Sequence, residues 1–482
     1  MSYQKTKVTV GSFLLWALLC SPPALAQYGP GEEPTPAGAL SERILKDLER
    51  GLPATPSLRA TRNALNDHSI KSLVIDQDIV NSNDSYFSHV IPNPGSITNQ
   101  QQSGRCWMFA GLNLLRPKVI GKHGMKDFAL SQSYGLFYQK LEAANRSLEL
   151  AIALRDEPIH SRRLDTFLKH LIGDGGNWNY LRALVEKYGA VPSTVMPDSY
   201  AAAHTGEMDA LLATRLRKAF IEMRTASQQG ADVPRLRQVK QAALQDIYKI
   251  LVLCLGQPPK NFEWRYENKD GKVTPLETYT PLSFSKKFLD SELDRYVSFV
   301  DYPGQPMHAR LQWPWERTMA DQPDMEAINV STEELRSMTL ASILADEPVW
   351  FAANVAAEGD RKKGLWLQDI DRSGDLFGID FSMTKADELA YDNGGPGHAM
   401  LFTGVDVKGG KPVKWKVENS WGDQSGDKGW FTIGDSWFSR HVYQVIIDKR
   451  FVPANLLPIL QQKPHVLPPW DPFADWQSTS ER

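Results

Sequence analysis

Cysteine is scarce in this 482-residue chain, which has three: Cys20, Cys106 and Cys254. So few thiols exclude a disulfide-dense secreted scaffold. No zinc-type spacing of Cys and His is present, and neither a metal site nor a cofactor is expected. The formal net charge is -3 at pH 7, without a run of basic residues, so no nucleic-acid partner is expected. The apolar and charged fractions, 42% and 23%, are those of an ordinary globular protein with a large core.

The chain also lacks an apolar run long enough to span a membrane. Two lysines precede the apolar residues 8–19, and Ala24 and Ala26 form a small-x-small cleavage site. This order is typical of a secretory signal peptide, residues 1–26, with the mature chain beginning at Gln27. The sequence therefore predicts an exported protein, periplasmic or secreted, without a stable membrane anchor.

Export would remove one of the three thiols. Cys20 does not suit a lipid anchor, because Leu19 before it is bulky where such sites need a small residue. Cys254 lies in the apolar run 251–255 and is interpreted as a buried small hydrophobe. A disulfide between Cys254 and Cys106 is not expected, which leaves Cys106 as the thiol to explain.

Helical periodicity dominates the first half of the mature chain, and strand-like composition dominates the end. Residues 69–80 alternate and are expected to be extended. Apolar residues recur at helical spacing after Cys106, over 130–155, over 178–188 and in a hairpin over 201–260. Strands are expected over 349–355, 398–407, 413–418, 429–433 and 442–447. Helices before strands indicate an α+β fold.

Cys106 stands where a buried helix is expected to begin, just after a Ser103-Gly104 turn. A thiol acts as a nucleophile in its thiolate form, and a helix N-terminus and a nearby imidazolium both stabilise that anion. Gln100, six residues earlier, supplies a side-chain amide donor. These residues indicate a prepared thiol nucleophile, but the imidazole must come from elsewhere in the chain.

His398 has the most suggestive setting among the ten histidines. The glycine-rich residues 394–397 lead it onto an apolar strand, and Asn419 stands at the end of the next strand. An Asn side-chain oxygen can accept a hydrogen bond from the imidazole and fix its tautomer, and Trp421 could shield that bond from water. Taken alone, a histidine in this setting is structural about as often as it is catalytic, and an Asn-Ser pair at a strand end more often forms a turn than orients a histidine. Together with Cys106, the two residues form a combination that is specific for thiol catalysis.

These motifs resemble those of papain-like cysteine peptidases, and more closely the bleomycin hydrolase and aminopeptidase C branch. The resemblance covers residues 60–471. The matching motifs are residues 100–110, 130–134, 174–176, 187–192 and 418–422.

The resemblance assigns roles to the candidate residues. Cys106 is the nucleophile, His398 is the general base and acid, and Asn419 orients the imidazole. Gln100 and the backbone N–H of Cys106 form the oxyanion hole. In addition, the adjacent glycines at 175 and 176 (Gly175, Gly176) bind the substrate backbone, where a side chain would block close approach.

The same resemblance implies a papain-like two-lobed fold, with a helical left lobe and a β-barrel-like right lobe. The expected parts are a signal peptide over 1–26, an N-terminal linker and helical segment over 27–75, a lobe with the nucleophile helix over 76–200, a mainly helical insertion over 201–345, a β-rich lobe over 346–450, and a C-terminal arm over 451–482. The branch is hexameric, so a homo-oligomer acting on peptides is implied.

Three departures from papain favour this branch, and the length of the C-terminal tail departs from the branch itself. Ser103 replaces the usual disulfide cysteine, and Arg105 replaces a small residue. The interval from Cys106 to His398 is 292 residues, about twice that of papain. The longer interval matches the helical insertion of the branch. Ten residues, 473–482, follow the part of the arm that resembles the branch, so restriction to the substrate's N-terminal end is less firmly implied than peptidase chemistry.

The expected function is an exported cysteine aminopeptidase that acts through an acyl-enzyme. Two further readings use the same residues: a thiol acyltransferase and an endopeptidase. A third is a non-catalytic papain-like binding scaffold, which would be signalled by loss of Cys106 or His398, and both are present.

Overall fold

The computed structural model describes residues 35–52, 54–289 and 293–474. The predicted signal peptide and the last eight residues lie outside the described residues. The chain forms two units, which divide between His68 and Ser69. Across the described residues, no helix is both long and apolar enough to cross a membrane.

The described elements of the first unit are all helical. They are η1 (Pro36–Gly38), α1 (Glu42–Gly51) and α2 (Pro56–Asp67). The Ser41 hydroxyl accepts a hydrogen bond from the third residue of α1, and Thr55 caps α2 in the same way. None of the described residues in these three elements is buried.

The second unit holds the remaining elements. Its helices are α3 (Ile70–Val74), α4 (Gln77–Ser82), α5 (Cys106–His123), α6 (Gln132–Ala153), α7 (Arg162–Lys169), α8 (Trp178–Tyr188), α9 (Tyr200–Ala203), α10 (Gly206–Gln228), α11 (Val233–Leu255), α12 (Pro281–Phe288), α13 (Thr332–Leu344), α14 (Ser373–Phe377), α15 (Lys385–Ala390) and α16 (Asp435–His441), with 3-10 turns η2 (Leu293–Arg295), η3 (Lys449–Phe451) and η4 (Leu457–Gln461). Its strands are β1 (His89–Val90), β2 (Phe262–Trp264), β3 (Glu277–Tyr279), β4 (Tyr296–Val300), β5 (Arg310–Trp313), β6 (Met325–Asn329), β7 (Val349–Ala353), β8 (Leu365–Trp366), β9 (His398–Lys408), β10 (Lys411–Glu418), β11 (Trp430–Gly434), β12 (Val442–Asp448) and β13 (His465–Val466).

One large sheet organises the second unit. Its strand order is β13-β5-β6-β4-β12-β7-β9-β10-β11-β8, with β1 paired to β9, and β2 and β3 form a separate hairpin. The centre is antiparallel: β12 pairs with both β4 and β7, and β7 pairs with β9. Because β12 comes late in the chain yet lies in the middle of the sheet, distant segments meet there.

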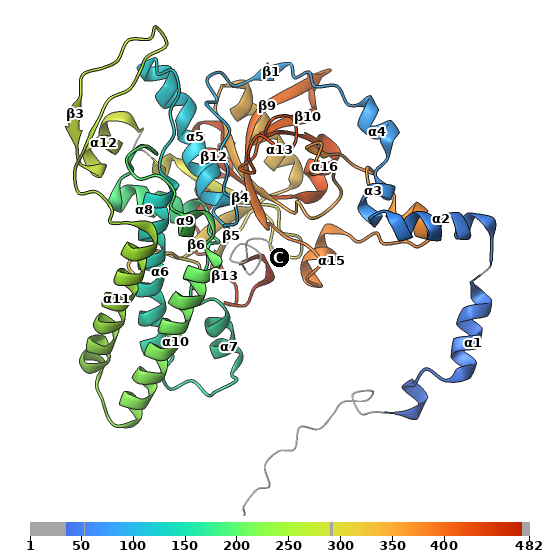
Figure 1. Ribbon diagram of the computed structural model, residues 1–482, viewed down its shortest axis with the longest axis horizontal. Coiled ribbons are helices and arrows are strands. Elements are labelled where there is room, and N and C mark those ends of the chain that lie inside the picture. The colour runs from blue at the N-terminus through green and yellow to red at the C-terminus, as the bar shows by residue number, and fades with distance from the viewer. Residues whose placement is uncertain (1–34, 53, 290–292, 475–482) are drawn as a thin grey trace, which may run out of the picture. The chain divides into compact units, whose positions relative to one another are not determined.

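Helices form the other layer of this unit. In Figure 1, α6, α10 and α11 run side by side on one side, and the strands β9, β10 and β12 lie on the other. Helix α5 lies between them and packs against both β9 and α8. Every position from Cys106 to Pro117 is buried, so α5 has no solvent face in its first three turns. The predicted buried helix and the predicted hairpin over 201–260 are both confirmed.

The C-terminal segment is packed as far as Ala474. Strand β13 pairs with β5, and Phe473 stacks on Tyr302 and Trp313. The buried carboxylate of Asp471 accepts hydrogen bonds of 2.9 Å from the Trp313 indole and the Tyr302 hydroxyl. This segment is therefore part of the core and is held by specific polar contacts.

Two expectations from the sequence differ from the structure. Residues 69–80, expected to be extended, form α3 and α4, each capped by the side chain before it. The expected helical insertion over 201–345 also contains β4, β5 and β6, which belong to the main sheet. All five residues of β4 are buried, so its sequence shows no alternation of apolar and polar residues. Within this region α10, α11 and α12 come before β4, and α13 follows β6.

A buried ion pair joins the nucleophile helix to the sheet. Arg116 of α5 donates to the Glu418 carboxylate, at the end of β10, over 2.7 Å, and both side chains are almost fully buried. Asn113 donates to the same oxygen over 2.8 Å. Burial raises the pKa of Glu418, although the Arg116 guanidinium opposes that shift. Residues 116 and 418 thus fix the start of the helix relative to the end of the strand.

Glu418→Ala should lower the free energy of unfolding by about 3–5 kcal/mol, because it leaves the Arg116 charge buried without a partner. Urea denaturation followed by tryptophan fluorescence would measure this loss. Adding Arg116→Met to Glu418→Ala should recover part of the stability. The exposed Glu263→Ala is the control and should change stability by less than about 0.5 kcal/mol. A loss as small in Glu418→Ala as in the control would contradict the structural importance of the pair.

Candidate active site

Cys106 is the first residue of α5 and is 4% exposed. The backbone N–H groups of Met108 and Phe109 turn back to the Arg105 carbonyl, so the helix begins directly at the thiol. A helix N-terminus carries a partial positive charge, which favours the thiolate over the thiol. Cys106 and Cys254 form no disulfide within the part of the chain that the structure describes, and Cys254 is only half-buried.

Arg105, the residue that departs from papain, holds the segment before the thiol. It is fully buried, and its two terminal nitrogens donate to the two carboxylate oxygens of Asp198 over 3.0 and 2.8 Å. Its Nε donates to the Ser103 hydroxyl over 2.8 Å, and that hydroxyl donates to the Gln100 carbonyl over 2.6 Å. A bidentate charged pair is among the stronger hydrogen-bonded contacts, so the turn into α5 is rigidly supported.

Asp174 fixes the same turn from the other side. Its carboxylate accepts from the Gly104 N–H and from the buried Lys140 ammonium, each over 2.7 Å. Burial alone would raise the pKa of Asp174, but Lys140 holds it below its usual value. The Asp174 carbonyl also accepts from the Trp107 indole over 2.7 Å. Asp209, a second partner of Lys140, has its pKa raised by burial to about 6.

His398 begins β9 and is 2% exposed. Its Nε2 lies 2.9 Å from the Asn419 side-chain oxygen, which also accepts from the Ser420 N–H over 2.8 Å. Because that oxygen can only accept, Nε2 carries the ring hydrogen and Nδ1 is left as an acceptor. Nδ1 has no hydrogen-bond partner among the described residues. It is therefore available to take a proton.

Trp421 covers the imidazole. The two rings stack with centroids 4.7 Å apart, and the guanidinium of Arg361 lies 3.6 Å from the Trp421 ring centre on the exposed side of the stack. Burial lowers the pKa of His398 to about 4; the hydrogen bond to Asn419 raises it, and the Arg361 charge lowers it further. Arg361 was not expected from the sequence, since no motif marks it.

One small cavity brings four of the expected residues together. Cys106, His398, Gly175 and Gly176 all line it, with Trp350 and Ala352 of β7 among the other walls. A Cβ atom on Gly176 would lie 2.5 Å from the Trp107 ring, so only glycine fits there. The helical side and the strand side of the unit thus contribute opposite walls of a single cleft.

Gln100 is not among the residues that line this cavity. The side chain is buried; its Nε2 donates to the Ser103 carbonyl over 2.6 Å, and its Oε1 accepts from the Ser420 hydroxyl over 2.7 Å. The carbonyl of Ser420 accepts from the Gln100 backbone N–H over 2.8 Å. One amide hydrogen of Nε2 remains after these contacts. Gln100 therefore links the segment before the thiol to the segment that carries Asn419.

Polar residues that the sequence reading missed support this cleft: Lys140, Asp198, Arg116 and Arg361. Each is paired with a residue far away in the chain, so no local spacing could reveal it. The sequence does offer one signal for Lys140 and Arg116, because each lies in a predicted helix whose apolar residues recur at helical spacing. A Lys or an Arg is rarely buried in such a helix without a charged partner. No group of three or more His, Cys, Asp or Glu side chains able to hold a metal occurs among the described residues.

The structure combines an α+β fold, a thiol at a helix N-terminus, and an imidazole that begins a strand and is hydrogen-bonded to an asparagine. This is the arrangement of papain-like cysteine peptidases. Residues 39–474 match the Peptidase C1-like family, and the chain belongs to that family.

Similar proteins carry related names. Aminopeptidase G of Lactobacillus delbrueckii subsp. lactis is 37% identical over 80% of this chain and 88% of that protein. Bleomycin hydrolase of Rattus norvegicus is 33% identical over 91% and 98% of the respective chains. The crystal structure of PepW from Lactobacillus rhamnosis matches with a TM-score of 0.88 at 35% identity, over 91% of this chain and 99% of that one.

Arg361→Gln should shift the acid limb of the pH profile of kcat/KM to higher pH. Removing the guanidinium charge raises the pKa of His398, so the neutral imidazole that accepts the thiol proton forms only at higher pH. The expected shift is roughly 0.4 pH unit at low ionic strength, the effect of a unit charge about 8 Å away across water. Arg361→Lys is the matched control: it keeps the charge and should restore the wild-type limb. An unchanged limb in Arg361→Gln would show that the charge does not reach the imidazole.

Proposed function

We propose that this protein is an exported cysteine aminopeptidase that hydrolyses peptide bonds at the N-terminal end of peptides. One observation carries the proposal: Cys106 and His398 line the same cavity as a pair of glycines, and His398 is bonded to Asn419. Membership of the Peptidase C1-like family supports the chemistry, and the names of the relatives, Aminopeptidase G and Bleomycin hydrolase, support the substrate class.

In the proposed reaction, His398 Nδ1 takes the proton from the Cys106 thiol. The thiolate then attacks the carbonyl carbon of the scissile bond. The negative charge that develops on the carbonyl oxygen is stabilised by the Cys106 backbone N–H and the remaining amide hydrogen of Gln100. Asn419 keeps the imidazole in the tautomer that this transfer needs.

The second half of the reaction returns the enzyme to its starting state. The imidazolium of His398 gives its proton to the leaving amine, which departs and leaves a thioester on Cys106. His398 then takes a proton from a water molecule, and the resulting hydroxide attacks the thioester carbonyl. The C–S bond of the thioester breaks, the acid is released, and the His398 imidazolium returns its proton to the Cys106 thiolate. Trp421 keeps bulk water from the His398–Asn419 hydrogen bond throughout.

Cys106→Ala should abolish hydrolysis of aminoacyl-arylamides, because the attacking thiolate is lost. The full chain should also cut a peptide with a free N-terminal amine and leave its N-acetylated copy intact. Liquid chromatography of the products would show which bond is cleaved. In this assay Gln100→Ala should lower kcat by about 10²–10³, the usual loss for one oxyanion donor.

Cys254→Ala is the matched control, since its thiol lies outside the cavity and its pKa is raised by burial. It should retain wild-type turnover. Hydrolysis retained in Cys106→Ala would refute the nucleophile. Cleavage of the N-acetylated peptide at an internal bond would instead favour an endopeptidase, and transfer of the acyl group to an added amine would favour an acyltransferase.

We also propose that residues 1–26 direct export and are removed. This rests on the lysines, apolar run and alanines at the N-terminus alone. N-terminal sequencing of the protein from the envelope or medium of its host should find Gln27 first, and an intact N-terminus in the cytoplasm would contradict export. A homo-oligomer, implied by the resemblance, is part of the same proposal; light scattering that gives a monomer would exclude it.

A further inference from the structure

A second cavity, larger than the cleft, lies beside it in the second unit. It measures about 860 Å³ and is bounded by the segments that follow β7, surround α14 and α15, and end α16. We call it the acidic cavity, after its carboxylate walls. Six carboxylates line it: Glu358, Asp369, Asp371, Asp375, Asp380 and Glu388. Its volume suits a ligand of several residues, since ligand pockets commonly measure about 300–1,000 Å³.

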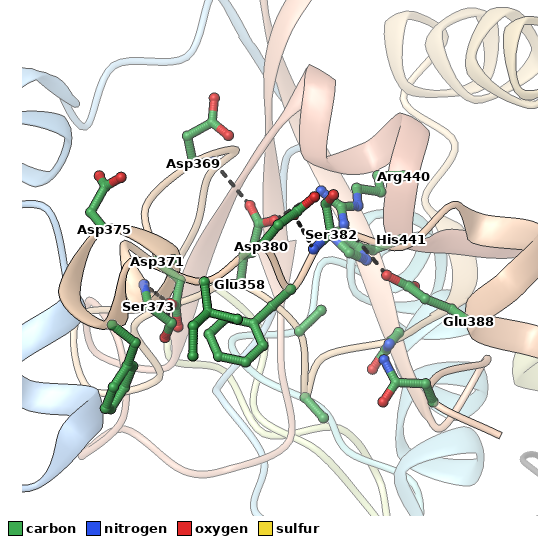
Figure 2. Close-up of a pocket in the computed structure, with 18 of the residues that line it drawn as sticks. Glu358, Asp369, Asp371, Ser373, Asp375, Asp380, Ser382, Glu388, Arg440 and His441 are labelled. Atoms are coloured by element: carbon green, nitrogen blue, oxygen red, sulfur yellow. Dashed lines mark hydrogen bonds and ion pairs between the residues drawn. The ribbon is translucent and has the colours of Figure 1, made fainter. Parts of the chain in front are cut away.

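The charges of the acidic cavity are only partly balanced. Arg440 is the only Lys or Arg among its described lining residues. It pairs with Glu358 over 3.0 Å and with Glu388 over 3.5 Å. Figure 2 shows Arg440 between these carboxylates, with Asp371 and Asp375 on the far side of the cavity. Asp375 lies 3.9 Å from Arg372, which is outside the wall, and the other carboxylates leave a negative surface that attracts a cation.

Two buried polar side chains in the wall carry atoms without a hydrogen-bond partner among the described residues. His441 is 1% exposed, and neither ring nitrogen has a hydrogen-bond partner among the described residues. Glu388 is 6% exposed, and its Oε2 is likewise without a partner there. A buried polar atom without a partner costs free energy, so these atoms indicate a ligand that donates hydrogen bonds. Burial lowers the pKa of His441 to about 3, which keeps its imidazole neutral and one nitrogen an acceptor.

An apolar patch adjoins the carboxylates. Phe377, Ile379 and Phe381 line the same cavity and are large apolar side chains that remain more than 40% exposed. The rings of Phe377 and Phe381 lie edge to face, with their centroids 6.4 Å apart. A ligand that carries both a positive charge and apolar surface matches this wall, because an aromatic face also attracts a cation.

The sheet sets the distance between the acidic cavity and the catalytic imidazole. Val442, which follows His441, pairs with Ala353, and Ala353 pairs with His398. Two strand spacings separate the two ends of this row, roughly 10 Å. The loop that ends at His398 also starts in the acidic cavity, at Asn393. An extended peptide covers this distance in about three residues.

We propose that the acidic cavity binds a lysine or arginine side chain of the peptide substrate, about three residues from the scissile bond. The ammonium or guanidinium would donate to Glu388 Oε2 and to a ring nitrogen of His441, and the side chain's stem would pack on Phe377 and Phe381. The inference rests on the proposed function. In an aminopeptidase the substrate extends on the leaving-group side, so this cavity makes that side selective for basic residues.

Three peptides with the same N-terminal residues test this. They differ in one residue, the third after the scissile bond, which is Lys, Gln or Glu. At low ionic strength the wild type should cleave the Lys peptide with a kcat/KM about tenfold above that of the Gln peptide, and the Glu peptide more slowly still. Higher ionic strength should reduce the difference. Equal kcat/KM for the three peptides would overturn the inference.

Variants locate the preference. Glu388→Gln should reduce the Lys-to-Gln ratio to less than about threefold. The double variant Asp369→Asn with Asp380→Asn, on exposed side chains of the wall, serves if Glu388→Gln does not fold. Glu263→Gln removes a charge far from the cavity and should keep the wild-type ratio. A ratio unchanged in both cavity variants would place the preference elsewhere.

His441→Phe separates a ligand contact from a structural one. It keeps the ring volume and removes the two polar atoms without partners, so the thermal unfolding temperature should not fall. The Lys-to-Gln ratio should fall nevertheless. A lower unfolding temperature with an unchanged ratio would assign His441 a structural role only and contradict the proposed contact.

Two measurements keep this inference distinct from the proposed function. An aminoacyl-arylamide has no residue that reaches the acidic cavity, so its hydrolysis tests the proposed function alone. Binding of the fluorescently labelled Lys and Glu peptides to Cys106→Ala, followed by anisotropy, tests the acidic cavity alone. Tighter binding of the Lys peptide by about tenfold is expected, and equal affinities would overturn the inference even if the arylamide is hydrolysed.

Discussion

The candidate site depends on the buried contact between Arg116 and Glu418. Cys106 lies ten residues before Arg116 on the same helix, about 15 Å along its axis, and Asn419 directly follows Glu418. One ion pair therefore couples the helix that presents the thiol to the strand end that orients His398. Because a lone charge at this depth is costly, the two halves of the cleft have little freedom to separate. The ion pair restricts the position of α5 relative to β10, and the other polar contacts of the site orient individual side chains within that arrangement.

Much of the fold could be predicted from local pattern. Helix α8 has the expected bounds, and β9 begins at His398 as expected, because both have a clear period and turn residues at their ends. Strand β4 escaped prediction because it is buried on both faces and sits in a stretch rich in Pro and aromatic residues. The short helices α3 and α4 were misread because five or six residues fit either period.

The candidate site was likewise predictable only where short motifs mark its residues. Such motifs mark Cys106, His398, Asn419 and the two glycines at 175 and 176. The structure brings all but Asn419 to one cavity, and Asn419 is hydrogen-bonded to His398. The residues that hold them in place could not be predicted. Asp198 lies 93 residues from Arg105, and nothing in either local sequence specifies the pairing. That pairing also explains how a large charged residue fits where papain has a small one, because the buried guanidinium is bound by the Asp198 carboxylate and the Ser103 hydroxyl.

The central place of β12 has a consequence for the newly made chain. This strand comes from residues 442–448 and separates β4 from β7, so the sheet cannot be completed until nearly the whole sequence has been synthesised. Contacts between distant segments of this kind form late and slowly. His398 lies on β9, whose partner β7 depends on β12 for its other edge. A nascent polypeptide therefore holds its thiol and its imidazole on separate segments until residues 442–448 have joined the sheet.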